Sequence, residues 1–101
     1  MANTAKVLFR GAATTNTATT LYTVPSATTT VVTSIVVTNT AGSSGTFTLA
    51  MAGTNLATTV TVGSYDSTVI DLKQVLTSTQ TITGGASATT INFHISGVEI
   101  S

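Results

Sequence analysis

Apolar and polar residues alternate along most of the chain, in short runs that turn residues separate. A period of two is typical of β-strands with one face in a core, and no window has the 3.6-residue period of an amphipathic helix. The pattern predicts about eight strands, within residues 6–10, 19–25, 29–39, 46–52, 58–63, 64–73, 74–85 and 89–100. About a quarter of the residues are threonine, which packs well on a pleated sheet. The sequence therefore predicts an all-β chain.

The segment TTVVTSIVVTN, residues 29–39, is apolar on both of its faces. Strict alternation places Val32 and Val36 on one face. The other face carries Val31, Ile35 and Val37. This two-faced character is typical of a central strand.

Leu8 presents a similar case in KVLFR, where it lies between two cations and opposite Val7 and Phe9. Alternation then places Leu8, Val32 and Val36 on outer faces, which makes them candidate interface residues. A second sheet or the chain's own loops would remove them from that role by covering them.

Turn residues indicate how the strands connect. The AGSSG loop predicts a hairpin between residues 29–39 and 46–52, and Gly84-Gly85 predicts a turn. After Gly97 the apolar residues shift to even numbers, which predicts a β-bulge at Ser96-Gly97. We expect a single-domain antiparallel β-sandwich over residues 1–101, of jelly-roll or immunoglobulin-like kind, rather than a closed barrel.

Charge excludes two classes of partner. Charged residues are 6% of the chain, and the formal net charge is zero, so no field exists to attract nucleic acid or an anionic membrane. A neutral surface has little protection against association, which suits a homo-oligomer or a larger assembly. There is no cysteine, no secretory signal pattern and no apolar run that could span a bilayer, so we expect a soluble product made in the cytosol.

Residues that could carry catalysis are few. His94 lies on the polar face of the last strand with no carboxylate nearby in sequence, which favours a solvent-facing or interface histidine. Asp66 and Asp71 point to opposite faces of one strand, so they suit a turn and a partner for Lys73 better than a glycosidase pair. The dense ligand spacing of a calcium loop is missing. We therefore predict no catalytic residue, no metal and no cofactor.

Tyr22 and Tyr65 are the aromatic residues that would stack on a sugar, if the protein binds one. Both are retained as candidate interface residues. The simpler interpretation is that they are tyrosines at the rim of the core.

Two segments carry a resemblance to a known group of proteins. LYTVP followed by VVTSIVVTNT, a Gly/Ser loop and TFTL, with FHISGVEIS at the end, resembles small virion proteins of tailed bacteriophages. The matching residues are Leu21, Tyr22, Val24, Pro25, Asn39, Phe47, Leu49, Gly97, Val98, Glu99 and Ile100. After Pro25 the chain departs from the pattern, since SATTTV stands where a Gly- and Lys-containing turn is usual. The resemblance implies a non-enzymatic structural component of the particle, on the capsid surface or the tail, and assigns no functional residues.

Three hypotheses follow for function. The first is a capsid decoration subunit that is made in the host cytoplasm and binds the major capsid protein or other virion proteins. The second is a tail- or fibre-associated module that binds a host surface glycan through Tyr22 or Tyr65. The third is a cell-wall hydrolase, which requires two of the acids Asp66, Asp71 and Glu99 to face one cleft.

Overall fold

The computed structural model describes residues 3–101, and the chain forms β-strands joined by turns and loops. In chain order the strands are β1 (Asn3–Ala12), β2 (Thr20–Thr23), β3 (Thr29–Asn39), β4 (Gly45–Met51), β5 (Thr54–Val62), β6 (Ser67–Leu76), β7 (Thr81–Ala86) and β8 (Ile91–Ile100). The all-β prediction is confirmed. The described residues contain no helix long and apolar enough to cross a membrane.

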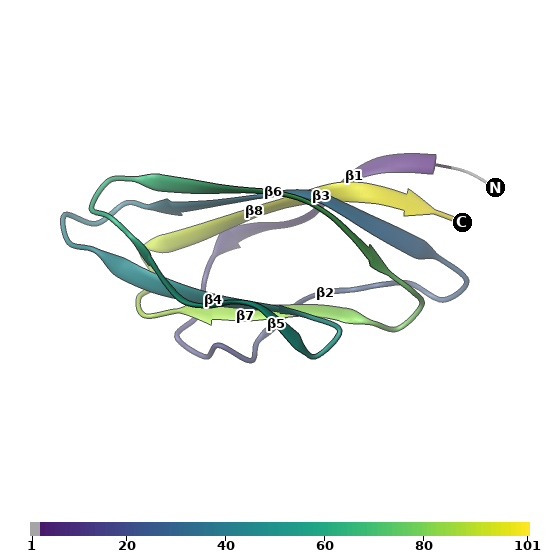
Figure 1. Ribbon diagram of the computed structural model, residues 1–101, viewed down its shortest axis with the longest axis horizontal. Helices are drawn as coiled ribbons and strands as arrows, with labels where there is room; N and C mark the ends of the chain where they lie inside the picture. Colours follow the sequence, from purple (N-terminus) through teal and green to yellow (C-terminus); the bar gives the residue numbers. More distant parts are fainter. Residues whose placement is uncertain (1–2) are drawn as a thin grey trace.

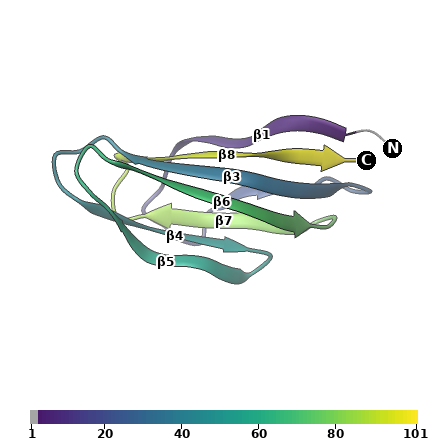
Figure 2. The ribbon, with the colours of Figure 1, turned by 45° about the horizontal axis from the view of Figure 1, so that its top comes forward.

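The strands form two antiparallel sheets packed face to face (Figure 1). Sheet A has the order β1-β8-β3-β6 and sheet B has the order β2-β7-β4-β5 (Figure 2). Strands β1 to β4 pair with β8, β7, β6 and β5 respectively, as if one long hairpin were wrapped around the core. The predicted sandwich is therefore present, and its connectivity is that of a jelly roll.

The strand pair predicted as a hairpin crosses between the sheets instead. β3 belongs to sheet A and β4 to sheet B, so the prediction of a hairpin over residues 29–52 is wrong. The buried Asn39 side chain fixes the crossing: its Oδ1 accepts from the Ala41 N–H (3.0 Å), and its Nδ2 donates to the carbonyls of Ser43 (2.8 Å) and Val62 (3.3 Å). One amide side chain thus ties the β3–β4 loop to the end of β5.

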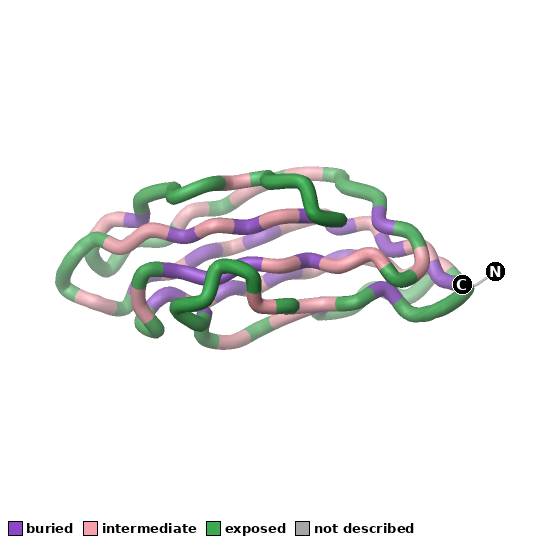
Figure 3. The backbone as a smooth tube through the Cα atoms, turned by 90° about the horizontal axis from the view of Figure 1, so that it is seen from below, coloured by how far each residue is buried: buried purple, intermediate pink, exposed green. Residues whose placement is uncertain are grey.

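The core lies between the two sheets and follows the predicted alternation on most strands (Figure 3). Phe47 from sheet B meets Phe93 from sheet A edge to face, with ring centroids 6.1 Å apart and planes at 73°. The predicted inward residues of β4 and β8 are buried: Phe47, Leu49, Met51, Ile91, Phe93 and Ile95. On β6, Ile70 and Leu72 are half-buried and pack against this core, as predicted.

Bulges interrupt the alternation in both neighbours of β8. The register of β1 shifts at Leu8 and that of β3 shifts at Thr33, while β8 itself runs without interruption through Gly97. The predicted bulge at Ser96-Gly97 is thus at the right level of the sheet but on the wrong strand. A Cβ at Gly97 would overlap the carbonyl oxygen of Val31 and lie 3.1 Å from Leu8 Cδ1, so glycine gives both bulges their room.

Gly84 and Gly85 do not form the predicted turn. They lie inside β7, opposite Leu49 and Thr48 of β4. A Cβ on Gly84 would come within 2.6 Å of the Thr48 carbonyl oxygen, and one on Gly85 would lie 2.9 Å from the Thr14 carbonyl oxygen. These glycines allow close backbone approach in the middle of sheet B, which a sequence search for turns misreads.

Candidate interaction surface

Two of the candidate interface residues lie in the core. Leu8 and Val32 are both buried, so the prediction that they face outward is wrong. The bulge at Leu8 turns this side chain inward beside Phe9 and leaves Val7 exposed, and the bulge at Thr33 puts Val32 on the same side as Ile35. Each bulge shifts the side-chain parity of its strand by one residue.

Val36 lies on the outer face of sheet A, as predicted, and it belongs to a larger apolar group. Val31 also faces outward because of the bulge, although strict alternation placed it in the core. We define the valine face as Val31, Val36, Val69, Val75 and Val98. Val69 and Val75, on the edge strand β6, are 66% and 61% exposed.

The valine face consists of two rows that run across the strands. In one row Val31 is paired with Val98 on β8 and with Val75 on β6. In the other, Val36 is paired with His94 and with Val69. The five valines carry no charge, the sixth member of the rows is His94, and Asp71 and Lys73 lie between the rows on the exposed edge strand β6.

A shallow hollow of ≈ 410 Å³ adjoins this face where the two bulges meet β8. Its lining is Ala5, Lys6, Val7, Thr33, Ser96, Gly97 and Val98. The lining has one cation and no acid, so it offers no pair of groups for acid–base chemistry.

A polar cluster closes one end of the sandwich, and Tyr22 is at its centre. The Tyr22 hydroxyl donates to Glu99 Oε2, and because its single hydrogen is used there, the Thr30 hydroxyl donates to Tyr22 over 2.9 Å. Lys6 Nζ lies 3.3 Å from the same carboxylate oxygen. The Glu99 side chain is only 14% exposed, whereas that of Lys6 is 48% exposed.

Two pKa values respond to this geometry. The hydrogen bond from Tyr22 lowers the pKa of Glu99, partial burial opposes it, and Lys6 adds to the lowering. Burial raises the pKa of Tyr22, and the adjacent Glu99 carboxylate raises it further. At neutral pH the cluster therefore holds a carboxylate and a neutral phenol.

The cluster joins both sheets rather than forming a reaction centre. Tyr22 comes from sheet B, and Thr30, Glu99 and Lys6 come from three strands of sheet A. It contains one carboxylate and no second acid or histidine, so it lacks the second carboxylate that a two-acid glycosidase mechanism requires. Tyr22 was singled out for sugar stacking, but its hydroxyl holds the two sheets together.

Tyr65 lies at the other end of the molecule. It is 76% exposed in the β5–β6 loop, where its backbone N–H donates to the Ala41 carbonyl (3.0 Å). The Tyr22 cluster lies where β3 begins and Tyr65 lies where β3 ends. The 11 residues of β3 separate the two tyrosines, so they do not line a common groove.

The acids are also distributed over the molecule. Asp66 is a turn residue, as predicted: its N–H donates to the Gly63 carbonyl (3.2 Å) and its Oδ1 accepts from the Ser67 N–H (2.8 Å). Asp71 is exposed on the outer side of β6, while Glu99 points toward the space between the sheets. Within residues 3–101, no three His, Asp or Glu side chains are close enough to hold a metal ion.

Sequence reasoning missed most of the valine face. Alternation on β6 already placed Asp71 and Lys73 outward, and the same parity places Val69 and Val75 outward with them. It also missed the contact between Tyr22 and Glu99. The two residues are 77 positions apart in the sequence, so no local pattern indicates their contact.

Comparisons with protein-family models and with curated proteins gave no match. The resemblance to phage virion proteins therefore rests on the two segments that carry it.

Proposed function

We propose that this protein is a non-enzymatic structural component of a bacteriophage particle, a decoration subunit that binds the capsid shell through the valine face. The observation that carries the proposal is the pair of apolar rows across β8, β3 and β6, with Asp71 and Lys73 between them on the edge strand. The resemblance to small virion proteins supplies the class of partner, namely the major capsid protein or another virion protein.

The surface chemistry supports a docking role. Charged residues are depleted at the centre of protein interfaces, because an ion that loses its water must find a partner. The chain has three basic and three acidic residues, and none of them lies in the valine rows. Ser34 and Ser96 are paired between the rows, and their hydroxyls can hydrogen-bond to water in the free subunit or to a partner on contact.

The two segments that resemble virion proteins also support the proposal. Tyr22 of LYTVP and Glu99 of GVEI form one hydrogen bond between the sheets. The resembling residues thus include a contact that the jelly roll needs, and they reach Val98 of the valine face, next to Glu99.

The alternative of a glycan-binding tail module has less support. Jelly rolls occur in lectins as well as in viral capsids, and Tyr65 is exposed enough to stack on a sugar. It would stand alone, however, because Tyr22 is at the opposite end and its hydroxyl is already bound. Binding of the purified protein to a glycan array, lost in Tyr65→Ala, would favour this alternative.

Locating the protein on the particle tests the proposal. We expect cryo-electron microscopy of the phage that encodes the chain to show its density at repeated positions on the shell. Density at the tail alone would favour the alternative, and a particle without the protein would overturn both.

A matched pair of variants tests the surface. We expect Val36→Lys, on the inner strand β3 of the valine face, to abolish binding to shells assembled without the protein, because the contact would have to remove an ammonium group from water. Thr61→Lys is the control, since Thr61 is exposed on the outer side of sheet B. Equal binding by the two variants, both folded, would exclude the valine face.

A further inference from the structure

The sandwich has four edge strands, and they differ in how well they are protected against pairing with another chain. An unprotected edge offers free backbone N–H and C=O groups to a further strand. β1 carries the cations Lys6 and Arg10 and a bulge, and β2 has only 4 residues. β5 has two register shifts against β4 and a left-handed residue, Thr59, with φ of 52°.

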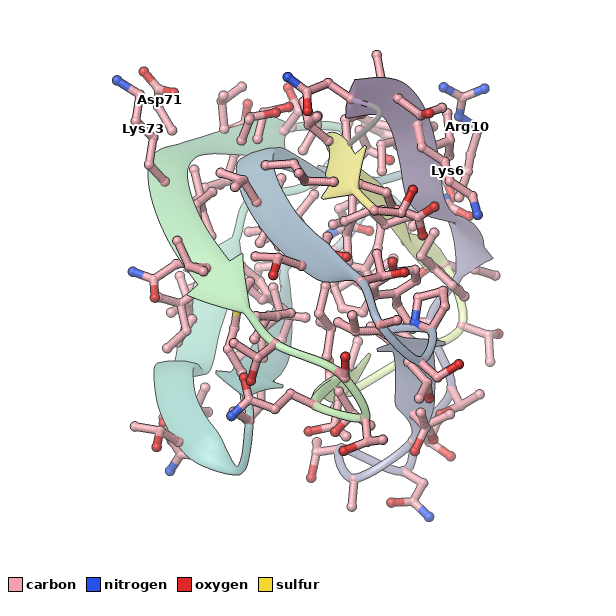
Figure 4. All side chains as sticks on the ribbon, turned by 90° about the vertical axis from the view of Figure 1, so that its right-hand side faces the viewer. Lys6, Arg10, Asp71 and Lys73 are labelled. Carbon is pink, nitrogen blue, oxygen red and sulfur yellow. The ribbon has the colours of Figure 1, made fainter. Side chains whose placement is uncertain are left out.

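β6 is less protected, because its one register shift, where Leu72 and Lys73 lie opposite Thr33 of β3, leaves the alternation of its side chains intact. It has 10 residues, it contains neither proline nor glycine, and it is paired on one side only, with β3. Its outward residues from Ser67 to Val75 remain exposed, including Lys73 at the register shift. Its two charges are of opposite sign, and they lie on either side of Leu72 at equal sequence distance. Figure 4 shows Asp71 and Lys73 projecting together from one side of the molecule, with Lys6 and Arg10 on the opposite side.

This arrangement is complementary to itself. Two copies of β6 can run antiparallel with Leu72 opposite Leu72 of the second copy. In that register, a residue a given number of positions before Leu72 faces the residue the same number of positions after Leu72 in the second copy. Asp71 then faces Lys73 of the second copy, and Lys73 faces its Asp71. In the same register Val69 faces Val75 of the second copy, so the most exposed valines cover one another.

The valine rows agree with the same register. The row Val98–Val31–Val75 of one copy meets the row Val69–Val36–His94 of the other, because Val75 faces Val69. Each row of one copy is therefore aligned with a row of the other copy across the contact. A shift by two residues would break the rows and place Lys73 opposite Lys73, or Asp71 opposite Asp71.

We propose that the protein forms a two-fold symmetric dimer by antiparallel pairing of β6 with β6 of a second copy, centred on Leu72. The dimer has one continuous sheet in the order β1-β8-β3-β6-β6-β3-β8-β1, and the two valine faces become one surface. Such a contact is closed, since both edges are used up by the pairing. It does not depend on the proposed function, because it involves only copies of this chain.

Charge reversal tests the pairing. We expect sedimentation equilibrium to show a concentration-dependent dimer for the wild type. Asp71→Lys and Lys73→Asp should each weaken the dimer by about 100-fold, because each reversal counts twice in a two-fold contact. Arg10→Asp, which changes the net charge as Lys73→Asp does but on β1, should leave the dissociation constant unchanged.

Variants that restore the opposite charges across the contact make this test specific. The double variant Asp71→Lys, Lys73→Asp exchanges the two charges and should dimerise like the wild type. The two single variants, mixed, should form a heterodimer. A wild type that stays monomeric at its highest soluble concentration overturns the proposal, and so do folded single variants that dimerise normally.

Disulfide trapping tests the register without altering the charges. The chain contains no cysteine, so single introduced cysteines report on one position each. A mixture of Val69→Cys and Val75→Cys should form an intermolecular disulfide on mild oxidation, because the two positions face each other. Neither variant alone should do so. Equal cross-linking of the Val69→Cys protein with itself, or no cross-linking in the mixture, overturns this register.

Discussion

The hydroxyl of Tyr22 is the residue-level link between the two sheets. It donates to a carboxylate that is mostly removed from solvent, and it accepts from the buried Thr30. Hydrogen bonds to a charged group contribute more to stability than neutral ones. A single oxygen atom therefore joins β2 to β3 and β8 at this end of the sandwich.

We expect Tyr22→Phe to lower the free energy of unfolding by about 2 kcal/mol at neutral pH, because Glu99 loses its charged hydrogen bond and Thr30 loses its acceptor. Urea unfolding measures this as a lower midpoint with an unchanged slope. Tyr65→Phe is the matched control and should change stability by less than about 0.5 kcal/mol, since Tyr65 is exposed. Equal losses in both variants would contradict the role of the Tyr22 hydroxyl.

Glu99 gives a pH dependence with a defined sign. Its pKa is lower in the folded protein than its ordinary value of 4.5, so the folded state favours the carboxylate. This contribution to stability is present above pH 4.5 and is lost as the pH falls through the folded-state pKa. We expect Glu99→Gln to be less stable than the wild type at pH 7 and to lose less stability on acidification.

The measurement is a series of urea unfolding curves from neutral to strongly acid pH. The wild-type and Glu99→Gln curves should converge at the acid end. Lys6→Gln is a useful comparison, because the Lys6 side chain is 48% exposed and its ion pair with Glu99 should be worth less than about 1 kcal/mol. A difference between wild type and Glu99→Gln that stays constant with pH would show that the carboxylate charge contributes nothing.

Bulges determine which side chains of β1 and β3 in sheet A face the core. The sequence predicted these orientations less well than any other feature of the strands. Alternation was sufficient for β8, where each apolar residue is followed by a polar one as far as Ser96. It failed where apolar residues are adjacent, as in Val7-Leu8-Phe9 and Val31-Val32. A bulge there leaves the pattern equally apolar, so parity alone could not say which side chain turns inward.

Three glycines mark the positions where close contacts between backbone segments escaped prediction. Gly97 lies where both bulges approach β8, and Gly84 and Gly85 lie where neighbouring backbone approaches β7. In the sequence all three resemble turn or bulge residues. Their close contacts come from other segments, so the reason for glycine is visible only in the folded chain. The local sequence pattern was sufficient to predict the fold class, whereas predicting the valine face required knowledge of these non-local contacts.

We expect Gly97→Ala to destabilise the protein by about 3 kcal/mol or more, because the added Cβ overlaps the Val31 carbonyl and crowds Leu8. Gly11→Ala is the control within the same sheet: its Cβ would meet only the Phe9 ring, at 3.7 Å and 3.9 Å. That change should be neutral or slightly stabilising, since alanine restricts the unfolded chain. Thermal unfolding of both variants gives the comparison, and a mild effect of Gly97→Ala would refute the close approach.

The stability of the whole molecule depends on β8, which is the last strand in the chain but an inner strand of its sheet. β8 pairs with β1 on one side and with β3 on the other, so its contacts join residues from both ends of the sequence. Strands that are paired on both sides contribute more backbone hydrogen bonds than edge strands do. The two ends of the described chain are therefore unequal in their importance for stability.

Matched truncations test this inequality. Removing residues 97–101 takes Glu99 from the Tyr22 cluster. It leaves β1 without a partner along Asn3–Lys6, and it removes the β8 partner of β3 along Thr29–Val32, where Thr30–Val32 stay paired with β6. We expect a loss of about 5 kcal/mol, comparable to the entire stability of a marginal domain, and therefore no cooperative unfolding transition. Removing residues 1–5 takes Asn3–Ala5 from the edge strand β1 and should leave a cooperative transition, followed by circular dichroism in urea. If the first truncation unfolds as cooperatively as the second, the central position of β8 does not control the stability of the sandwich.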